Sequence, residues 1–203
     1  GTNQKHQINE QPNTFYLFQQ VYDKDGKAIQ NAFVDRDGNG KITEADRYLT
    51  GKSPMAKVFM GLSSEFTYRN WDLGFNLRAN LGNYVFNSLA SGNSTTYNYS
   101  GKGFLVNYYE AIYKTGFTQI NSTEQGASDY FLENASFLKM DNITLGYSFK
   151  KLFTNRLSGR ISASVQNVFT ITKYSGLDPE TSAVDGSMWP RPRTFTLGIN
   201  LNF

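Results

Sequence analysis

Residues 55–86 read MAKVFMGLSSEFTYRNWDLGFNLRANLGNYVF, and this stretch decides the fold class. On both sides of Arg69-Asn70, apolar residues occupy nearly every second position, a period typical of β-strands with one apolar face. The two runs, 55–68 and 71–86, cover roughly 14 to 16 residues each, whereas an average strand has about five or six. We therefore expect two long antiparallel strands joined by a tight turn, longer even than the roughly 9–11 residues that cross a bilayer.

The same alternation recurs in four other segments of the chain. In the last segment, one face carries five apolar residues, namely Phe195, Leu197, Ile199, Leu201 and Phe203. Residues 143–149 and 161–172 repeat the pattern, and residues 15–18 begin a shorter, less regular run. Six strands cannot close a barrel, because single-chain bacterial barrels start at about eight. The sequence therefore predicts an all-β protein in which these strands form part of a larger antiparallel β-barrel wall.

The predicted connections alternate in length. Residues 69–70 and 150–155 are short, whereas 23–54, 87–135 and 175–192 are long and rich in Gly, Asn, Ser and Asp. Short turns at one end and long loops at the other are typical of outer-membrane barrels, whose short turns are periplasmic. A content of 15% aromatic residues combined with a mean hydropathy of −0.49 fits the same class. No apolar run is long enough for a transmembrane helix, and no signal peptide or initiator Met precedes Gly1, which suggests processing or a longer parent chain.

Composition excludes several other functions. The chain has no cysteine, so we expect no disulfide, zinc-thiolate site or thiol nucleophile. Twenty basic and seventeen acidic residues give a net charge of +3, which is too balanced for a nucleic-acid partner. The single histidine, His6, lies in a polar stretch, and the pair Asp178 and Glu180 lies on a loop without supporting groups. We therefore expect that the protein is not an enzyme.

Four sequence blocks resemble the C-terminal region of SusC/RagA-family TonB-dependent transporters from Bacteroidetes. They occur in the family's order and cover most of residues 30–203: KVFMG through YRNWDL (57–73), FLKMDNITLGY (137–147), QNVFTITKYSGLDPE (166–180) and PRTFTLG (192–198). The resemblance implies that residues 1–203 are about six C-terminal strands of a barrel with about 22 strands. The terminal Phe203 resembles the signal that the barrel-assembly machinery reads.

The same resemblance implies a function and partners. Family members are outer-membrane importers of large nutrients such as oligosaccharides or peptides. A plug fills the barrel, a SusD-like surface lipoprotein caps it, TonB energises its opening, and lipid surrounds it. The plug, the TonB-contacting segment and the N-terminal strands would belong to the remaining N-terminal part of the same transporter. Nothing in these residues separates glycan from peptide as the imported nutrient.

Residues 35–46 form a second motif, with the spacing of an EF-hand calcium loop. Position 6 is Gly40, which supplies the sharp turn, and position 12 is Asp46, where Glu is usual. The six predicted ligand positions are Asp35, Asp37, Asn39, Lys41 through its carbonyl, Thr43 and Asp46. We expect a structural calcium ion in an extracellular loop. The alternative is an Asp/Gly-rich turn that needs no metal.

Four tyrosines in the longest predicted loop are candidate substrate contacts: Tyr97, Tyr99, Tyr108 and Tyr109. Aromatic rings beside amides and hydroxyls suit the stacking of sugars, but they equally suit packing within the loop or contact with a lipoprotein. A second reading of the whole chain is a cell-surface β-sandwich that binds glycan and calcium. That reading predicts shorter strands and a chain that stays monomeric without detergent.

Overall fold

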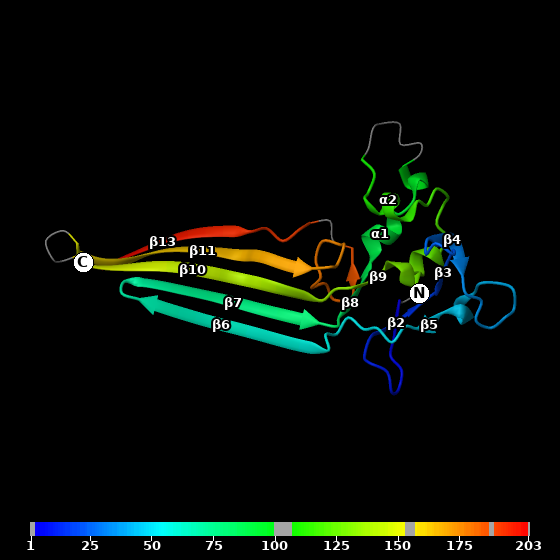
Figure 1. The fold of residues 1–203 in the computed structure, drawn as a ribbon, viewed down its shortest axis with the longest axis horizontal. Helices are drawn as coiled ribbons and strands as arrows, with labels where there is room; N and C mark the ends of the chain where they lie inside the picture. Colours follow the sequence, from blue (N-terminus) through cyan, green and yellow to red (C-terminus); the bar gives the residue numbers. More distant parts are fainter. Residues whose placement is uncertain (1–2, 100–106, 153–156, 187–188, 203) are drawn as a thin grey trace. The chain divides into compact units, whose positions relative to one another are not determined.

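The computed structural model describes residues 3–99, 107–152, 157–186 and 189–202, and the chain divides into two compact units (Figure 1). The sheet unit comprises residues 57–81, 136–173 and 190–203. The loop unit comprises residues 1–56, 82–135 and 174–189. Among the described residues, every helix is too short or too polar to cross a membrane.

The sheet unit is one antiparallel sheet with the strand order β13-β11-β10-β7-β6. Its strands are β6 (Val58–Tyr68), β7 (Trp71–Leu81), β10 (Phe137–Leu152), β11 (Leu157–Thr172) and β13 (Thr194–Asn202). The strands β10 and β11 have 16 residues each, and β6 and β7 have 11 each. All four therefore reach the roughly 9–11 residues that cross a bilayer.

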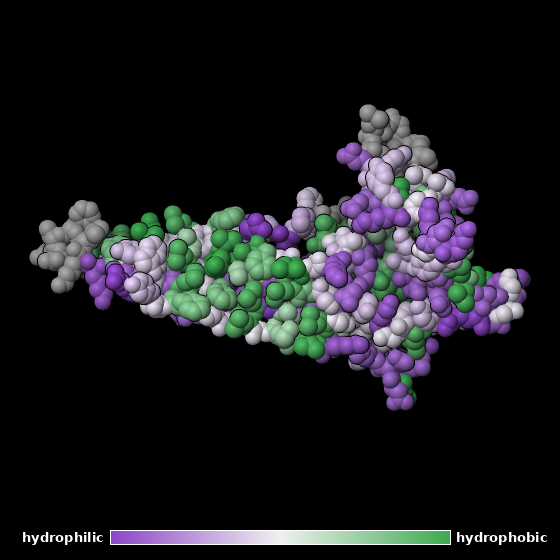
Figure 2. All heavy atoms as spheres, viewed as in Figure 1, coloured by the Kyte–Doolittle hydropathy of each residue, from purple (hydrophilic) through white to green (hydrophobic). Residues whose placement is uncertain are grey.

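The pairing register gathers the alternating apolar residues on one face of the sheet. One row across four strands consists of Leu62, Leu77, Met140 and Phe169. Another row across all five strands consists of Phe66, Leu73, Leu145, Ala163 and Leu197. Apolar residues cover much of the sheet in Figure 2. Several stay largely exposed, such as Phe195 (73%) and Leu197 (72%), which is costly in water and favourable in lipid.

Aromatic residues concentrate on this face near the short turns. Trp71 begins β7 and pairs with both Tyr68 on β6 and Tyr147 on β10. The Trp71 and Tyr147 rings lie 4.7 Å apart between centroids. Such rows of Trp and Tyr mark the membrane–water interface of a transmembrane barrel, because their rings are amphipathic. The short-turn end of the sheet therefore has the composition of one interfacial girdle.

A β-bulge interrupts the opposite, polar face. Between Met140 and Asn142 the register shifts against both neighbouring strands: Asp141 is an extra residue relative to β7, whereas two residues of β11, Asn167 and Val168, lie opposite it. Its carboxylate accepts two hydrogen bonds from the Arg78 guanidinium, at 2.6 and 3.0 Å. On β11 the irregularity falls at Asn167, whose φ of 53° is left-handed and explains the break in the alternation there. The bulge thus presents an ion pair on the polar face.

Gly146 permits a second ion pair on the polar face, between Asp72 on β7 and Arg160 on β11. Gly146 lies on β10 between those two strands and pairs directly with Asp72. The two side chains meet over Gly146, where a Cβ atom would lie 2.4 Å from both the Arg160 guanidinium and the Asp72 carboxylate. Any side chain at this position would displace the pair. Glycine between Leu145 and Tyr147 therefore leaves the space that the Asp72–Arg160 contact needs.

The structure corrects two expectations about the strands. The run 71–86 is not one strand: β7 ends at Leu81 because Gly82 adopts a φ of 81°, and the chain then enters the loop unit. Likewise, residues 15–18 do not join the predicted wall. They contribute β2 (Thr14–Leu17), whose Phe15 and Leu17 are fully buried in the loop unit. The described sheet therefore has five strands rather than six, and it is open.

The loop unit is built from short elements around a small core. Its strands form three small sheets: β1 (Gln4–Lys5), β2 and β5 (Tyr48–Leu49); β3 (Gln20–Tyr22) and β4 (Ala28–Phe33); β8 (Tyr84–Asn87), β9 (Leu132–Asn134) and β12 (Val184–Asp185). Its helical turns are η1 (Glu44–Asp46), α1 (Ser88–Gly92), η2 (Thr96–Tyr99), α2 (Ala111–Thr115), η3 (Gln125–Ala127) and η4 (Asp129–Phe131). The core contains Phe15, Leu17, Phe86, Phe117 and Phe131.

Buried glutamines join the segments of this unit. The Gln20 side-chain amide donates to the Ile29 carbonyl at 2.7 Å, and its oxygen accepts from Gln125 at 2.9 Å and Ser128 at 3.0 Å. The Gln125 oxygen in turn accepts from the Asn31 backbone N–H at 2.7 Å. Since each of these bonds is buried or partly buried, the loss of one partner would leave a costly unsatisfied group.

The geometry at Gly146 predicts the effect of a single methyl group. Gly146→Ala should lower the melting temperature of the purified receptor in detergent by about 1–2 °C, because the new Cβ separates Asp72 from Arg160. Gly61→Ala is the matched control, since Gly61 lies on the same sheet and its Cβ would enter open space. In an Asp72→Ala, Arg160→Ala background, where both side chains are truncated, Gly146→Ala should have no cost. An equal loss in both backgrounds would show that the ion pair is not the cause.

Candidate functional site

Residues 35–46, which connect β4 to β5, fold into a loop held by its own acidic side chains. The Asp35 carboxylate accepts hydrogen bonds from the Gly38 and Gly40 backbone N–H groups, both at 2.7 Å. The Asp37 carboxylate accepts from the Asn39 backbone N–H at 3.1 Å. Gly38 and Gly40 have φ values of 72° and 77°, a left-handed conformation that glycine adopts without strain. The backbone therefore turns around the Asp35 and Asp37 side chains, which accept its N–H groups.

Asp46 closes the loop from its other end. Its side chain is fully buried and accepts from the backbone N–H groups of Thr43 and Arg36, both at 2.7 Å. Thr43 is also the N-cap of η1 in a capping box with Asp46. The hydrogen bonds from Thr43 and then from Arg36 hold the pKa of the Asp46 carboxyl below its usual value. Asp46 is therefore a buried anion at neutral pH.

The loop brings three of the predicted calcium ligands together. Carboxylate oxygens of Asp35, Asp37 and Asp46 lie within 4.8 Å of one another. Three negative charges at this separation repel, and a hard cation with oxygen ligands would neutralise them. The side chains of Asn39 and Thr43 donate to Asp37 and Asp46, at 2.8 and 3.4 Å. The side-chain atoms that could bind a metal ion here include oxygens of three carboxylates, and this chemistry fits calcium.

Further hydrogen bonds and ring contacts hold the loop in place. The Lys41 backbone N–H donates to the Asn39 side chain at 2.8 Å, which continues the turn through the seventh position. The Arg36 guanidinium lies over the Tyr48 ring, 4.7 Å from its centroid. The Tyr48 hydroxyl donates to Asp129 at 2.6 Å, and burial together with Asp129 raises the pKa of Tyr48. Contacts on both sides of the acidic cluster therefore fix the loop to β5 and η4.

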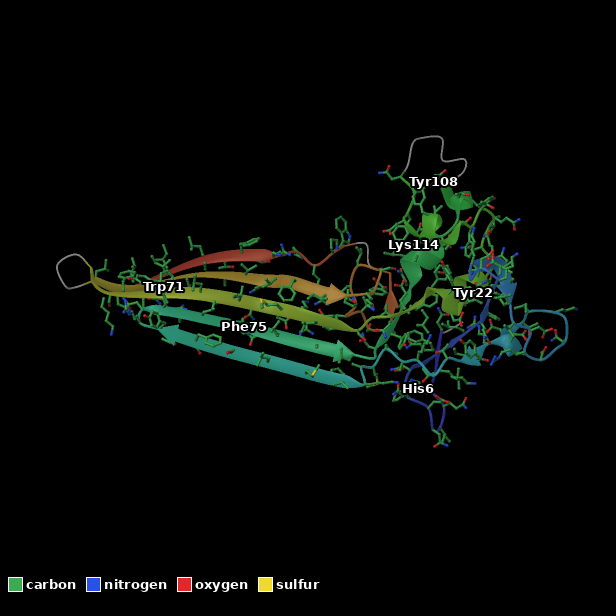
Figure 3. The ribbon with its side chains drawn as sticks, in the orientation of Figure 1. His6, Tyr22, Trp71, Phe75, Tyr108 and Lys114 are labelled. Atoms are coloured by element: carbon green, nitrogen blue, oxygen red, sulfur yellow. The ribbon has the colours of Figure 1, made fainter. Side chains whose placement is uncertain are left out.

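The four predicted tyrosines do not share one environment. Tyr97 in η2 and Tyr108 are about half exposed, at 50% and 49%, and Figure 3 labels Tyr108 near α2. Tyr99 ends η2. Tyr109 is partly buried and packs against the core of the loop unit. Of the three whose side chains are described, Tyr109 lines a cavity, so substrate contact by these tyrosines stays a prediction.

That cavity lies within the loop unit and has a volume of about 520 Å³. Besides Tyr109, its walls include Lys114, Tyr130, Phe131 and Glu133. Sequence reasoning identified only Tyr109, because the other wall residues come from η4, β9 and α2, and none carries a local motif. The volume of this cavity and its mixed aromatic and charged lining are typical of a small-molecule site. The predicted signal at Phe203 lies outside the described residues.

Comparison with known sequences gives close relatives. No family model matches the chain. The TonB-dependent receptor SusC of Bacteroides thetaiotaomicron is 45% identical over 98% of this chain and 20% of that protein. The chain belongs to the SusC/RagA family of TonB-dependent receptors. The TonB-dependent receptor P3 of Formosa agariphila is 29% identical over 84% of the chain and 19% of that receptor. The chain therefore spans about a fifth of the length of these relatives.

Solved structures agree in fold. A structure of the RagAB peptide transporter aligns with a TM-score of 0.69 at 22% identity, over the whole of this chain and 25% of the solved one. The RagAB peptide importer in its closed-closed state gives 0.68 at 24% identity, with the same shares covered. The family places the chain in the outer membrane, as a portion of a receptor barrel and not of an enzyme.

The lowered pKa of Asp46 predicts a pH dependence of stability. Because the folded-state pKa is below the unfolded value of about 3.9, the contribution of Asp46 is complete above that value. It is lost as the pH falls through the folded-state pKa. Between pH 7 and pH 3, the melting temperature of the wild type should therefore fall more than that of Asp46→Asn. Parallel curves for the two proteins would contradict this assignment.

Proposed function

We propose that this chain is the C-terminal portion of the barrel of an outer-membrane importer of large nutrients, oligosaccharides or peptides. The observation that carries the proposal is the five-stranded sheet whose apolar face is in register across all strands. From Trp71 to Ala79 this face covers nine residues, and the eight rises between them span about 27 Å along the strand. That length suits an apolar band about 25 Å tall crossed by tilted strands. The 45% identity to SusC supports the same conclusion.

The polar face then lines the lumen of a barrel with about 22 strands. Both edges of the described sheet, β6 and β13, present unpaired backbone groups, so further strands of the receptor would continue it on each side. A plug and a TonB-contacting segment would lie elsewhere in the receptor. A SusD-like lipoprotein would be its surface partner, in keeping with the RagAB name of the solved neighbours.

The competing β-sandwich is less well supported. A sandwich covers the apolar face of each sheet with a second sheet. Here the apolar side chains of β13 stay exposed, most of them by more than half: Phe195, Leu197, Ile199 and, to a smaller extent, Leu201. Strands of 16 residues are also much longer than the average of about five or six.

Nutrient uptake tests the transport proposal directly. A strain with an in-frame deletion of the receptor gene is grown on a panel of oligosaccharides and peptides as the only carbon source. We expect loss of growth on one nutrient class, restored by the gene on a plasmid and equally lost on depletion of TonB. Normal growth on every nutrient that requires TonB would refute the proposal.

We also propose that residues 35–46 bind a structural calcium ion through Asp35, Asp37 and Asp46, with Asn39, Thr43 and the Lys41 carbonyl as further ligands. The clustering of three carboxylates within 4.8 Å supports this role. Calcium would join the two ends of the loop and stabilise the connection between β4 and β5. An outer-surface loop is exposed to millimolar calcium, the range in which extracellular calcium modules bind.

Calcium binding predicts a metal-dependent stability. At a calcium concentration 100-fold above Kd, the folded loop unit should gain about 2.7 kcal/mol relative to the protein in EGTA. Asp35→Asn combined with Asp37→Asn should abolish the difference in melting temperature. The control is Asp23→Asn, because Asp23 organises a similar turn through hydrogen bonds from Asp25 and Lys27. A calcium effect of equal size in all three proteins would place the ion elsewhere.

A further inference from the structure

The cavity in the loop unit contains a carboxylate that is only partly neutralised. Glu133 on β9 lines the cavity and accepts hydrogen bonds from Asn87 at 3.0 Å and from Ser175 at 2.7 and 2.8 Å. All three donors are neutral. Among the described residues, no Lys, Arg or His nitrogen forms an ion pair with Glu133. A carboxylate has about four acceptor positions, so Glu133 keeps one for a further donor.

The other charges of the cavity leave the negative charge of Glu133 in excess. Glu110 and Lys114 form an ion pair at 2.9 Å on α2 and its preceding residue, and both line the cavity. Their side chains are mostly exposed, at 76% and 56%, and Figure 3 labels Lys114. One ammonium thus faces two carboxylates. Burial, followed by the charges of Asp185, Glu110 and Glu133, raises the pKa of the Tyr109 phenol, which agrees with a negative potential.

Aromatic rings form the rest of the wall. Tyr109, Tyr130 and Phe131 line the cavity, and the Tyr130 and Phe131 rings meet edge to face at 5.1 Å between centroids. Aromatic faces attract organic cations, and the attraction grows where water is excluded. A carboxylate beside aromatic faces is a combination that favours an ammonium or guanidinium group over a neutral or anionic one.

We propose that this cavity binds a positively charged group of the nutrient, an ammonium or guanidinium, with Glu133 as its counter-ion. The proposal rests on the import function and narrows its substrate. Two sources supply such a group: a basic side chain of a peptide, or the free amine of an amino sugar. In both, the cation donates to the remaining acceptor position of Glu133, and its carbon skeleton packs against the aromatic wall. Lys114 competes with the ligand for the same negative potential.

Calorimetry on the full-length receptor in detergent tests the proposal with two pairs of ligands that differ only in charge. One pair is a tripeptide with blocked termini and a central lysine, and the same tripeptide with that lysine Nε-acetylated. The other pair is a glucosamine dimer and its N-acetylated form. In at least one pair the charged ligand should bind about tenfold more tightly, as a charge-assisted hydrogen bond predicts. The pair that shows the preference identifies the source, and no preference in either pair overturns the proposal.

Two substitutions with opposite expected signs separate ligand recognition from loss of folding. Glu133→Gln should weaken binding of the charged ligand about tenfold and abolish the preference over the acetylated form. Lys114→Gln should tighten binding of the charged ligand about threefold, because it removes the competing cation. Lys24→Gln is the control with the same change of net charge in an exposed turn, and it should leave affinity unchanged.

The result is independent of the uptake experiment. If deletion of the receptor abolishes growth on a nutrient while Glu133→Gln and Lys114→Gln leave affinity unchanged, the import function stands and the cation site is refuted. If deletion has no effect on growth, the import function fails, whereas the affinities still report on the cavity.

Discussion

The constraint on which the structure depends is that lipid cannot hydrogen-bond to a peptide backbone. Every N–H and C=O at membrane depth must therefore pair within the sheet, which requires long antiparallel strands in continuous register. The register of β6, β7, β10, β11 and β13 meets this demand over most of their length. The period of two then places successive side chains on alternate faces, so the apolar rows and the Asp72–Arg160 pair lie on opposite faces of the sheet.

This constraint also explains what could be predicted from the sequence. The sheet strands were predictable because a sheet with one apolar and one polar face requires the same alternation in every strand. Residues 15–18 show a similar apolar pattern for a different reason: Phe15 and Leu17 pack into the small core of the loop unit. The end of β7 depended on the conformation of one residue, Gly82, and its positive φ has no periodic signal. The errors therefore arose within the core of the loop unit and at the point where β7 passes into it.

The candidate sites divide in the same way. The clustering of acidic side chains at 35–46 was predictable because these residues are close in sequence and the turns follow from local Asp–backbone hydrogen bonds. The cavity was not predictable, because Asn87, Lys114, Glu133 and Ser175 come from four separate segments. Only the fold brings them together, and of its wall only Tyr109 belonged to a recognisable cluster. A local motif thus encodes the acidic loop, and tertiary structure alone creates the cavity.

The buried contacts of Gln20 have a consequence for the order of folding. Gln20 bonds to Gln125 and Asp129, which are 105 and 109 residues further along the chain. Contacts between residues so far apart in sequence form slowly, because the chain loses the entropy of closing a large loop before the contact can stabilise it. The β6–β7 hairpin, whose strands are separated by two residues, lies inside that loop and can form much earlier. We therefore expect the hairpin to form before the loop unit, whose core includes residues as far along the chain as Ala183.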